Sequence, residues 1–288
     1  MAPQVVCNVC GSASREAVWT KDGYRLVRCR SCGLLYIENP PSSEELRAHY
    51  SFAAGYHKGL AADGADVVVH ADEARANLSV LNQNAQSGRL LDIGCSTGLF
   101  LAVALQAGWD ARGLEYSADS ARVARERHGL EVEQGELLSG RYAPALFDVV
   151  TMWDVIEHMP DPRAALRVVH EILKPGGLFV AKTPNADGIY PRASLAVAGL
   201  AGLWGHPEPP GHLYQFSVTT LGRLLRDCGF TTGRIHHQRI PIAYSFGDLK
   251  GWFRSAKWLA YSCAFAPLAL TGPWFGSGDA FTIVARKT

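Results

Sequence analysis

The sequence has almost no excess of charge of one sign. Its 28 lysine and arginine residues are balanced by 27 aspartate and glutamate residues, which leaves a formal net charge of +1. A protein that binds a nucleic-acid backbone usually carries a strong basic excess, because neutralised phosphates supply most of the affinity. The near-neutral balance therefore disfavours a nucleic-acid partner. With 48% hydrophobic and 19% charged residues, the composition is typical of a globular protein.

Long apolar runs are also lacking. A helix that crosses a bilayer needs about 20 apolar residues, and the two best candidates, residues 193–204 and 258–272, are shorter. A buried or interfacial helix is the better interpretation of both. Residues 1–7 show no basic region followed by an apolar stretch, so we expect no secretory signal and a cytoplasmic location.

Contact with a membrane surface stays open as an alternative. The last 58 residues hold seven lysines or arginines against two acidic residues, together with Trp252, Trp258 and Trp274. Such a mixture is found where a protein lies on an anionic membrane. A solvated basic face over a core helix is the simpler explanation of the same residues.

Cysteine is unevenly distributed. Four of the seven cysteines form two pairs, Cys7-x-x-Cys10 and Cys29-x-x-Cys32, separated by 18 residues. This spacing is typical of tetrathiolate zinc ribbons, and two disulfides would not suit a reducing compartment. Four thiolates fill a tetrahedral site, so the predicted zinc is structural, and a ribbon of about forty residues has too little core to fold without it. The alternative is four unrelated cysteines.

The other three cysteines, Cys95, Cys228 and Cys263, are expected to be small buried hydrophobic residues. The ribbon is predicted to cover residues 1–40. Linking helices follow over 41–86, the first opened by a capping box at Ser42 and Glu45.

Residues 87–288 are predicted to form an α/β domain, a Rossmann-like parallel sheet with helices on both faces, because strands and helices alternate from Arg89 onward. Such sheets bind ligands beyond the carboxyl ends of their strands. Two long segments, 184–216 and 241–278, interrupt the later part and are expected to be functional or to contain further helices. The strands are expected near Arg89–Ile93, Asp110–Glu115, Glu131–Gln134, Phe147–Trp153, Leu178–Thr183, Phe230–Ile240 and Ala280–Arg286.

A glycine-containing loop follows the first of these strands, in the run Leu90-Leu91-Asp92-Ile93-Gly94-Cys95-Ser96-Thr97-Gly98. Glycines let the backbone approach a ligand closely, and the helix that follows offers N–H groups to an anion. A dinucleotide fingerprint would need glycine at 94, 96 and 99, where the chain has Gly94, Ser96 and Leu99, so NAD or FAD fits badly. Glu115, at the end of the next strand, could accept hydrogen bonds from both hydroxyls of an adenosyl ribose. Alone it could equally be a solvated surface charge.

Taken together, four segments resemble the successive motifs of class I S-adenosylmethionine (SAM)-dependent methyltransferases. The resemblance is close over about residues 88–185 and extends to about 230 through Gly211-His212-Leu213-Tyr214-Gln215-Phe216-Ser217. It implies a seven-stranded methyltransferase sheet with a final antiparallel strand. The four segments are Asp92–Gly98, Gly113-Leu114-Glu115, Phe147-Asp148-Val149-Val150 and Leu173-Lys174-Pro175-Gly176-Gly177.

The resemblance also implies a cofactor site. It places the methionine part of SAM against the loop formed by Asp92, Gly94, Cys95 and Gly98, and the ribose at Glu115. Tyr116 would flank the adenine, Glu136 and Leu137 would meet its edge, and Trp153 and Asp154 would close the pocket. The sequence departs from the pattern at Ser96, where many members have glycine; serine is small enough for the loop to form, with restricted backbone angles.

Methyl transfer from a sulfonium needs in-line positioning, and removal of a proton when the acceptor is a hydroxyl. His158 is the leading candidate base, since its segment resembles the matching region of ubiquinone-biosynthesis O-methyltransferases; a helix-start histidine bonded to backbone is the alternative. His212 is the second candidate, with His206 nearby, and each could instead be structural. Asp154, Glu157 and His158 could also hold a hard cation such as Mg²⁺, although carboxylates there also serve as helix caps.

Zinc ribbons also precede the catalytic domain in sugar C-methyltransferases and in some ribosomal-RNA methyltransferases. The sugar enzymes carry a further C-terminal domain that is missing here, and the RNA enzymes would show more positive charge. We therefore expect a small-molecule or glycan acceptor, methylated at oxygen. The alternatives are an RNA methyltransferase and a non-catalytic adaptor that binds SAM or uses the ribbon in an assembly.

Overall fold

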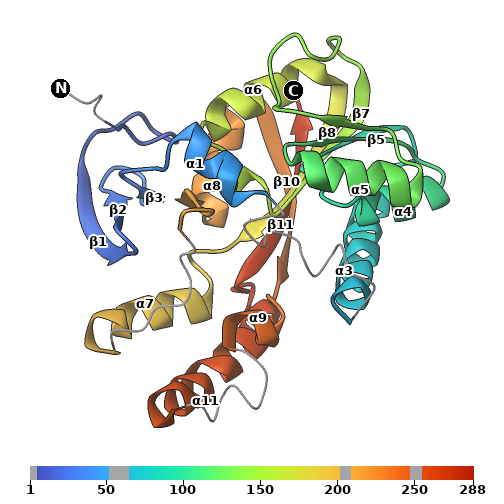
Figure 1. Ribbon diagram of the computed structural model, residues 1–288. Coiled ribbons are helices and arrows are strands. Elements are labelled where there is room, and N and C mark those ends of the chain that lie inside the picture. The colour runs from blue at the N-terminus through green and yellow to red at the C-terminus, as the bar shows by residue number, and fades with distance from the viewer. Residues whose placement is uncertain (1–4, 52–64, 202–208, 247–254) are drawn as a thin grey trace. The chain divides into compact units, whose positions relative to one another are not determined.

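The computed structural model describes residues 5–51, 65–201, 209–246 and 255–288. It contains one sheet of four strands and one of seven, and the chain divides into two compact units. The first unit comprises residues 1–40, 182–224 and 234–283, and the second comprises 41–181, 225–233 and 284–288. Figure 1 shows the elements by label and colour.

The four-stranded sheet has the order β1-β2-β3-β9 and belongs to the first unit. The strands β1 and β2 are antiparallel and joined by Asp22 and Gly23, both with positive φ. Positive φ at both central residues is the requirement of a type I′ hairpin turn, whose twist matches that of the strands. The sheet pairs β3 with β9, so residues far apart in sequence share one sheet. Its strands are β1 (Arg15–Lys21), β2 (Tyr24–Cys29), β3 (Leu35–Ile37) and β9 (Tyr214–Gln215).

The seven-stranded sheet has the order β10-β11-β8-β7-β4-β5-β6. The strand β4 pairs in parallel with both β5 and β7, and β5 pairs in parallel with β6. The predicted α/β fold with a seven-stranded sheet is therefore confirmed, with the last strand β11 lying between β10 and β8. The strands are β4 (Arg89–Ile93), β5 (Asp110–Glu115), β6 (Val132–Gln134), β7 (Phe147–Trp153), β8 (Leu173–Pro184), β10 (Phe230–Gln238) and β11 (Ala280–Lys287).

Local signals define three helices of the second unit. Ser117 caps α5 by accepting a hydrogen bond from the Ser120 N–H, and Gly129 ends the helix in the left-handed region. Asp161 caps α6, and the capping box of Ser42 and Glu45 opens α1 as predicted. These helices are α1 (Ser43–His49), α3 (Ala65–Asn82), α4 (Leu99–Gln106), α5 (Ala118–His128), the 3₁₀ helix η2 (Ile156–His158), α6 (Pro162–Ile172) and α8 (Val218–Asp227), the last shared between the units.

The two long segments contain helices of the first unit, as expected. They are α7 (Ile189–Ala201), α9 (Ile242–Phe246), α11 (Ala256–Thr271) and the 3₁₀ helix η3 (Gly272–Phe275). Their apolar sides meet in one cluster that includes Tyr190, Phe246, Tyr261, Ala266 and Ala269. The core of the second unit lies against the sheet, around Leu90, Leu101, Val149 and Val180. Burial of this apolar surface stabilises each unit.

Candidate functional site

The carboxyl ends of β4, β5 and β7 bring most of the predicted cofactor residues together in the second unit. Pairing sets Asp92 opposite Gly113 on one side and Thr151 on the other, and Ile93 opposite Leu114 and Met152. The loops that follow these three strands therefore leave the same edge of the sheet. This is the edge at which parallel α/β sheets bind ligands.

The loop after β4 has an unusual backbone. Gly94, Ser96 and Gly98 all have positive φ, at 72°, 52° and 86°. Two independent reasons exclude a side chain at Gly98. The backbone is left-handed, and a Cβ atom would clash with Leu130 Cδ1. Ser96 adopts the left-handed region despite its Cβ, and its N–H donates a 2.8 Å hydrogen bond to Glu115. The departure from glycine at 96 thus leaves the loop intact.

The Glu115 carboxylate accepts hydrogen bonds from both of the loops that follow β4 and β5. Its side chain is only 7% exposed, and one carboxylate oxygen accepts the Ser96 N–H while the other accepts the Ser117 N–H at 2.7 Å. Burial raises the pKa of Glu115 above its usual value, although these N–H donors act to lower it. The carboxylate therefore fixes the loop after β4 against the loop after β5.

Asp92 is a second buried acid at the same edge. It is 1% exposed, and the Thr151 hydroxyl donates a 2.7 Å hydrogen bond to its Oδ1. Burial raises the pKa of Asp92 to about 8; the Thr151 hydrogen bond opposes this change and the nearby Glu115 charge reinforces it. Burial makes it costly to ionise Asp92 and Glu115 together, and a cationic ligand would lower that cost. The pair therefore favours a cationic ligand.

The remaining walls come from the ends of β7, β5 and β6. Asp154 follows β7 with a φ of 55°, and the Trp153 ring packs edge-on against Phe100, with centroids 5.0 Å apart. Trp153 Nε1 is buried and has no hydrogen-bond partner among the described residues. Half-buried Tyr116 follows Glu115, and its carbonyl accepts a 3.1 Å hydrogen bond from Gln134 Nε2.

The turn after β6 carries two further predicted residues. The Gly135 N–H donates to the Glu115 carbonyl at 2.8 Å, which ties this turn to β5. Glu136 is exposed and its carbonyl accepts from Arg141, and Leu137 is partly buried. Glu136 and Leu137 therefore lie in the turn that follows β6, the strand paired with β5.

His158 ends η2, two residues after Ile156 and close to the carboxyl end of β7. Its Nδ1 lies 3.0 Å from the hydroxyl of Tyr50, the residue that caps the C-terminus of α1. The Tyr50 ring also meets the Tyr116 ring edge-on at 6.1 Å, and Arg47 Nε donates to the Tyr116 hydroxyl at 3.4 Å. The helix α1 therefore connects the candidate base to the candidate cofactor loop.

Sequence reasoning missed Tyr50, Arg47 and Thr151. No motif marks them; the capping box at Ser42 was the one local signal that a helix would present Tyr50 at its end. His212 lies in the first unit, half-buried just before β9, while His206 lies outside the described residues. Among the residues that the structure describes, Asp154 does not join Glu157 and His158 in a set of three close ligand atoms.

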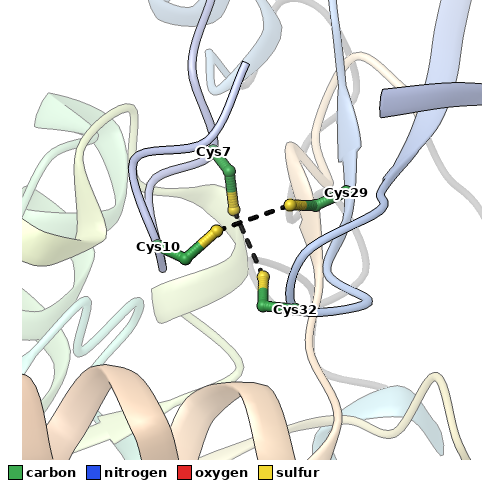
Figure 2. Close-up of side chains that lie close together, drawn as sticks. All are labelled: Cys7, Cys10, Cys29 and Cys32. Carbon is green, nitrogen blue, oxygen red and sulfur yellow. Dashed lines mark hydrogen bonds between the residues drawn. The ribbon is translucent and has the colours of Figure 1, made fainter. Parts of the chain in front are cut away.

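The four predicted ribbon cysteines converge in the first unit. Their Sγ atoms all lie within 4.8 Å of one another, with Cys7 to Cys32 and Cys10 to Cys29 at 3.5 Å (Figure 2). A disulfide needs about 2.05 Å, so these pairs are not bonded. Four sulfurs about 2.3 Å from a central Zn²⁺ in a tetrahedron would be about 3.8 Å apart, close to the separation seen.

The two knuckles have matching backbones. The Gly11 N–H donates to the Cys7 carbonyl at 2.8 Å, and the Gly33 N–H donates to the Cys29 carbonyl at 2.9 Å. Burial acts to raise the pKa of Cys29, but nearby backbone N–H groups outweigh it and lower the value to about 7. Burial raises the pKa of Cys7 to about 11. The donor set is that of a tetrathiolate metal site.

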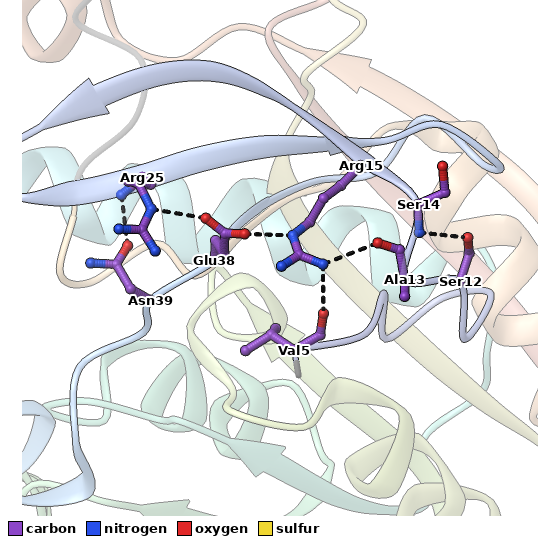
Figure 3. Close-up of polar contacts among 8 residues, drawn as sticks. All are labelled: Val5, Ser12, Ala13, Ser14, Arg15, Arg25, Glu38 and Asn39. Carbon is purple, nitrogen blue, oxygen red and sulfur yellow. Dashed lines mark hydrogen bonds and ion pairs between the residues drawn. The ribbon is translucent and has the colours of Figure 1, made fainter. Parts of the chain in front are cut away.

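A charged network braces the first knuckle (Figure 3). Glu38 accepts from Arg15 Nε at 2.5 Å and from Arg25 Nε at 2.8 Å, and Arg15 also donates to the carbonyls of Val5 and Ala13. Hydrogen bonds from Arg25 and Arg15 lower the pKa of Glu38. The network joins the chain on both sides of Cys7 and Cys10 to β1, β2 and the segment after β3.

Comparisons with known proteins agree with this site. A family profile described as a methyltransferase domain matches residues 70–233, more than half of the chain. A ubiquinone biosynthesis O-methyltransferase from Ruegeria pomeroyi is 39% identical over 104 residues, covering 34% of this chain and 42% of the relative. One of the same name from Xanthomonas campestris is 32% identical over 158 residues, covering 51% and 64%. The aligned parts therefore span less than two thirds of these relatives.

Solved structures show the same fold at low identity. A chain from the complex of the Haloferax volcanii Trm112 methyltransferase activator with a methyltransferase is 18% identical, with a TM-score of 0.57, covering 84% of this chain and 97% of its own. A SAM-dependent methyltransferase from Archaeoglobus fulgidus is 19% identical, with a TM-score of 0.53, covering 75% and 94%.

Proposed function

The chain belongs to the family of SAM-dependent methyltransferases, and from this premise we propose that it methylates a hydroxyl oxygen of a small-molecule or glycan acceptor. The observation that carries the proposal is the buried Glu115 carboxylate at the end of β5, fixed beside the loop after β4. Oxygen as the methylated atom is supported by the relatives named as O-methyltransferases.

The residues at the sheet edge fit SAM. The Glu115 oxygens accept the Ser96 and Ser117 N–H groups, and a carboxylate offers about four lone-pair sites, so it can also accept hydrogen bonds from ribose hydroxyls. The loop of Gly94, Cys95 and Gly98 would hold the methionine part, with Asp92 supplying negative charge beneath it. Tyr116, Glu136 and Leu137 would contact the adenine, and Trp153 and Asp154 would close the pocket. When bound, SAM supplies a methyl group activated by its sulfonium.

The chain's own contribution to the reaction is orientation and proton removal. We assign His158 as the base, because its ring is held by Tyr50 next to the carboxyl end of β7. In the tautomer that suits this role, the Nδ1–H group donates a hydrogen bond to the Tyr50 hydroxyl oxygen. The unprotonated Nε2 can then take the proton from the hydroxyl group that is methylated. His212 remains the second candidate base.

The test combines binding with label transfer. Calorimetry should show that Glu115→Gln lowers the affinity for SAM and its demethylated product at least tenfold, while Glu131→Gln, which removes an exposed acid paired with Arg112, has no effect. Labelled SAM is then incubated with fractionated host extract and wild-type protein or His158→Ala. Label in a small-molecule or glycan fraction, lost in His158→Ala with SAM affinity intact, supports the proposal. Label in RNA, or SAM binding without turnover, contradicts it.

Tyr50→Phe separates positioning from folding. We expect kcat to fall about tenfold, which is part of the roughly 10²–10⁴-fold contribution of a general base. SAM affinity should be retained, and the pH–rate profile should be displaced because the tautomer of His158 is no longer fixed. A profile that coincides with that of the wild type would contradict the assigned role.

We also propose that Cys7, Cys10, Cys29 and Cys32 bind a structural Zn²⁺, on the strength of the four converging sulfurs. Purified protein should contain one zinc per chain, and Cys10→Ser should lose it and unfold the four-stranded sheet at lower temperature. Cys263 is exposed on α11, contrary to the expectation that it is buried, and lies far from these four cysteines in sequence, so Cys263→Ser is the matched control. Full zinc content in Cys10→Ser would refute this assignment.

A further inference from the structure

The outward side of α11 carries no charge beyond its first turn. The helix α11 is labelled in Figure 1. It buries Tyr261, Ser262, Ala266 and Ala269 within the first unit. Its exposed positions after Lys257 recur with a helical spacing of three or four residues, so they form one side of the helix. A solvent-facing helix side normally carries charged and polar residues, and this one does not. The exposed positions are Ala260, Cys263, Ala264, Pro267 and Leu270.

This side leads directly into two exposed aromatic residues. Trp274 is 81% exposed and Phe275 is 74% exposed, both in η3, which follows α11 without a break. Leu270 is 40% exposed at the end of α11. We call these three residues together with the uncharged side of α11 the α11 apolar face. Large side chains this exposed and this close together mark an interaction surface.

The sequence that leads into α11 is basic. Between Asp248 and Asp279 the sequence has three basic residues, Lys250, Arg254 and Lys257, and no acidic one. All three precede Trp258, so the remaining stretch to Gly278 is uncharged. Lys257 is exposed in the first turn of α11, and the other two lie outside the described residues. In a chain of net charge +1, this stretch of sequence is therefore locally basic, and the structure exposes one of its cations, Lys257, on α11.

We propose that the α11 apolar face docks on the surface of an anionic lipid bilayer. Tryptophan and phenylalanine are favoured at the boundary between headgroups and acyl chains, and each nearby basic residue is attracted to anionic lipid. The described helices include none with the length and hydropathy needed to cross a bilayer, so α11 would lie along the surface. A second copy of the chain would carry the same basic stretch, with no acidic residue between Asp248 and Asp279 to pair with it, so an anionic surface is the better complement.

Vesicle co-sedimentation of the full chain tests the proposal. The probes are vesicles of phosphatidylcholine alone and vesicles in which about one lipid in three is the anionic phosphatidylglycerol. Wild-type protein should bind the anionic vesicles at least tenfold more tightly than the neutral ones, and less tightly at high salt. Trp274→Ser/Phe275→Ser should reduce binding at least tenfold, and Lys257→Glu should reduce the preference for anionic lipid. Leu105→Ser removes a 41% exposed leucine of α4 and is the matched control.

Circular dichroism and calorimetry with SAM verify that each variant is folded, since none of these residues lies in the proposed cofactor site. Equal vesicle binding by wild type and Trp274→Ser/Phe275→Ser would overturn the proposal. A second contrary outcome is protein that does not bind vesicles but forms a dimer in light scattering, with the dimer dissociated by Trp274→Ser/Phe275→Ser. The α11 apolar face would then contact a second copy of the chain and not a bilayer.

Discussion

Replacing Asp92 with asparagine removes a buried ionisable group while keeping its shape. The asparagine carbonyl can still accept the 2.7 Å hydrogen bond that the Thr151 hydroxyl donates to Oδ1. Because burial raises the pKa of Asp92 to about 8, the folded protein without ligand holds this carboxyl largely protonated at pH 7. The substitution therefore exchanges one neutral buried group for another in the folded state.

The effect on stability arises from the unfolded chain. There the carboxyl has its ordinary pKa of 3.8 and has lost its proton at pH 7. Between pH 3.8 and about 8 the folded state binds one proton that the unfolded state has released, so the free energy of unfolding falls as pH rises, by about 1.4 kcal/mol per unit. From pH 4 to pH 7 the loss is on the order of 4 kcal/mol. Asp92→Asn abolishes this loss.

The assay is urea unfolding of wild type and Asp92→Asn at several pH values. The variant should be more stable at pH 7 by on the order of 4 kcal/mol, with the difference vanishing near pH 4, while its affinity for cationic SAM falls at least tenfold. If the difference in unfolding free energy were constant from pH 5 to pH 8, the buried, protonated carboxyl would be refuted.

Asp148→Asn is a control of opposite sign. Burial acts to raise the pKa of Asp148, but the Lys174 ammonium at 2.7 Å and the Arg89 N–H at 2.9 Å outweigh it and lower the pKa. Its charge therefore stabilises the folded state above pH 3.8, and this contribution is lost as the pH falls. Asp148→Asn should be less stable than wild type at pH 7 and should approach it in acid.

Two further substitutions test other parts of the structure. Gly98→Ala should lower the free energy of unfolding by about 3 kcal/mol, since it combines a left-handed backbone with a Cβ atom 2.2 Å from Leu130; a thermal melt unchanged from wild type would contradict the loop geometry. Glu38→Gln should cost about 1 kcal/mol at pH 7 by weakening the bonds from Arg15 and Arg25. Because the pKa of Glu38 is lowered below 4.5, this difference should begin to shrink in urea titrations as the pH falls below 4.5 and should vanish below the lowered pKa; a difference independent of pH would argue against the ion pairs.

The sequence predicted the central part of the fold well, because its signals there are local. The bounds of β4, β5 and β7 match the expected ranges, because each strand is a run of largely buried residues that the sequence pattern indicates directly. The predicted zinc ligands also converge, since two Cys-x-x-Cys knuckles constrain their own geometry. The start of β8 was placed too late: the strand begins at Leu173, although Pro175 and two glycines favoured a loop there.

Pairings between distant segments were not predictable in the same way. The pairing of β3 with β9 joins Leu35 to Gln215 across 180 residues, and no pattern in either short strand specifies the other. The strand β2 was missed although Asp22-Gly23 is a hairpin signal, because its apolar residues Leu26 and Val27 are adjacent and do not alternate. Tyr50 reaches His158 across 108 residues, and tertiary packing alone brings them together.

The candidate site is also where local preferences are violated. Of the four residues other than glycine with positive φ among those described, Ser96 and Asp154 lie in the loops after β4 and β7, and the acid Asp92 is buried near the end of β4. The stability lost between pH 4 and pH 8 is the work of ionising Asp92 in apolar surroundings. A cationic ligand that supplies the counter-charge recovers that work on binding, so ligand affinity must rise with pH over the same interval in which the unliganded protein becomes less stable.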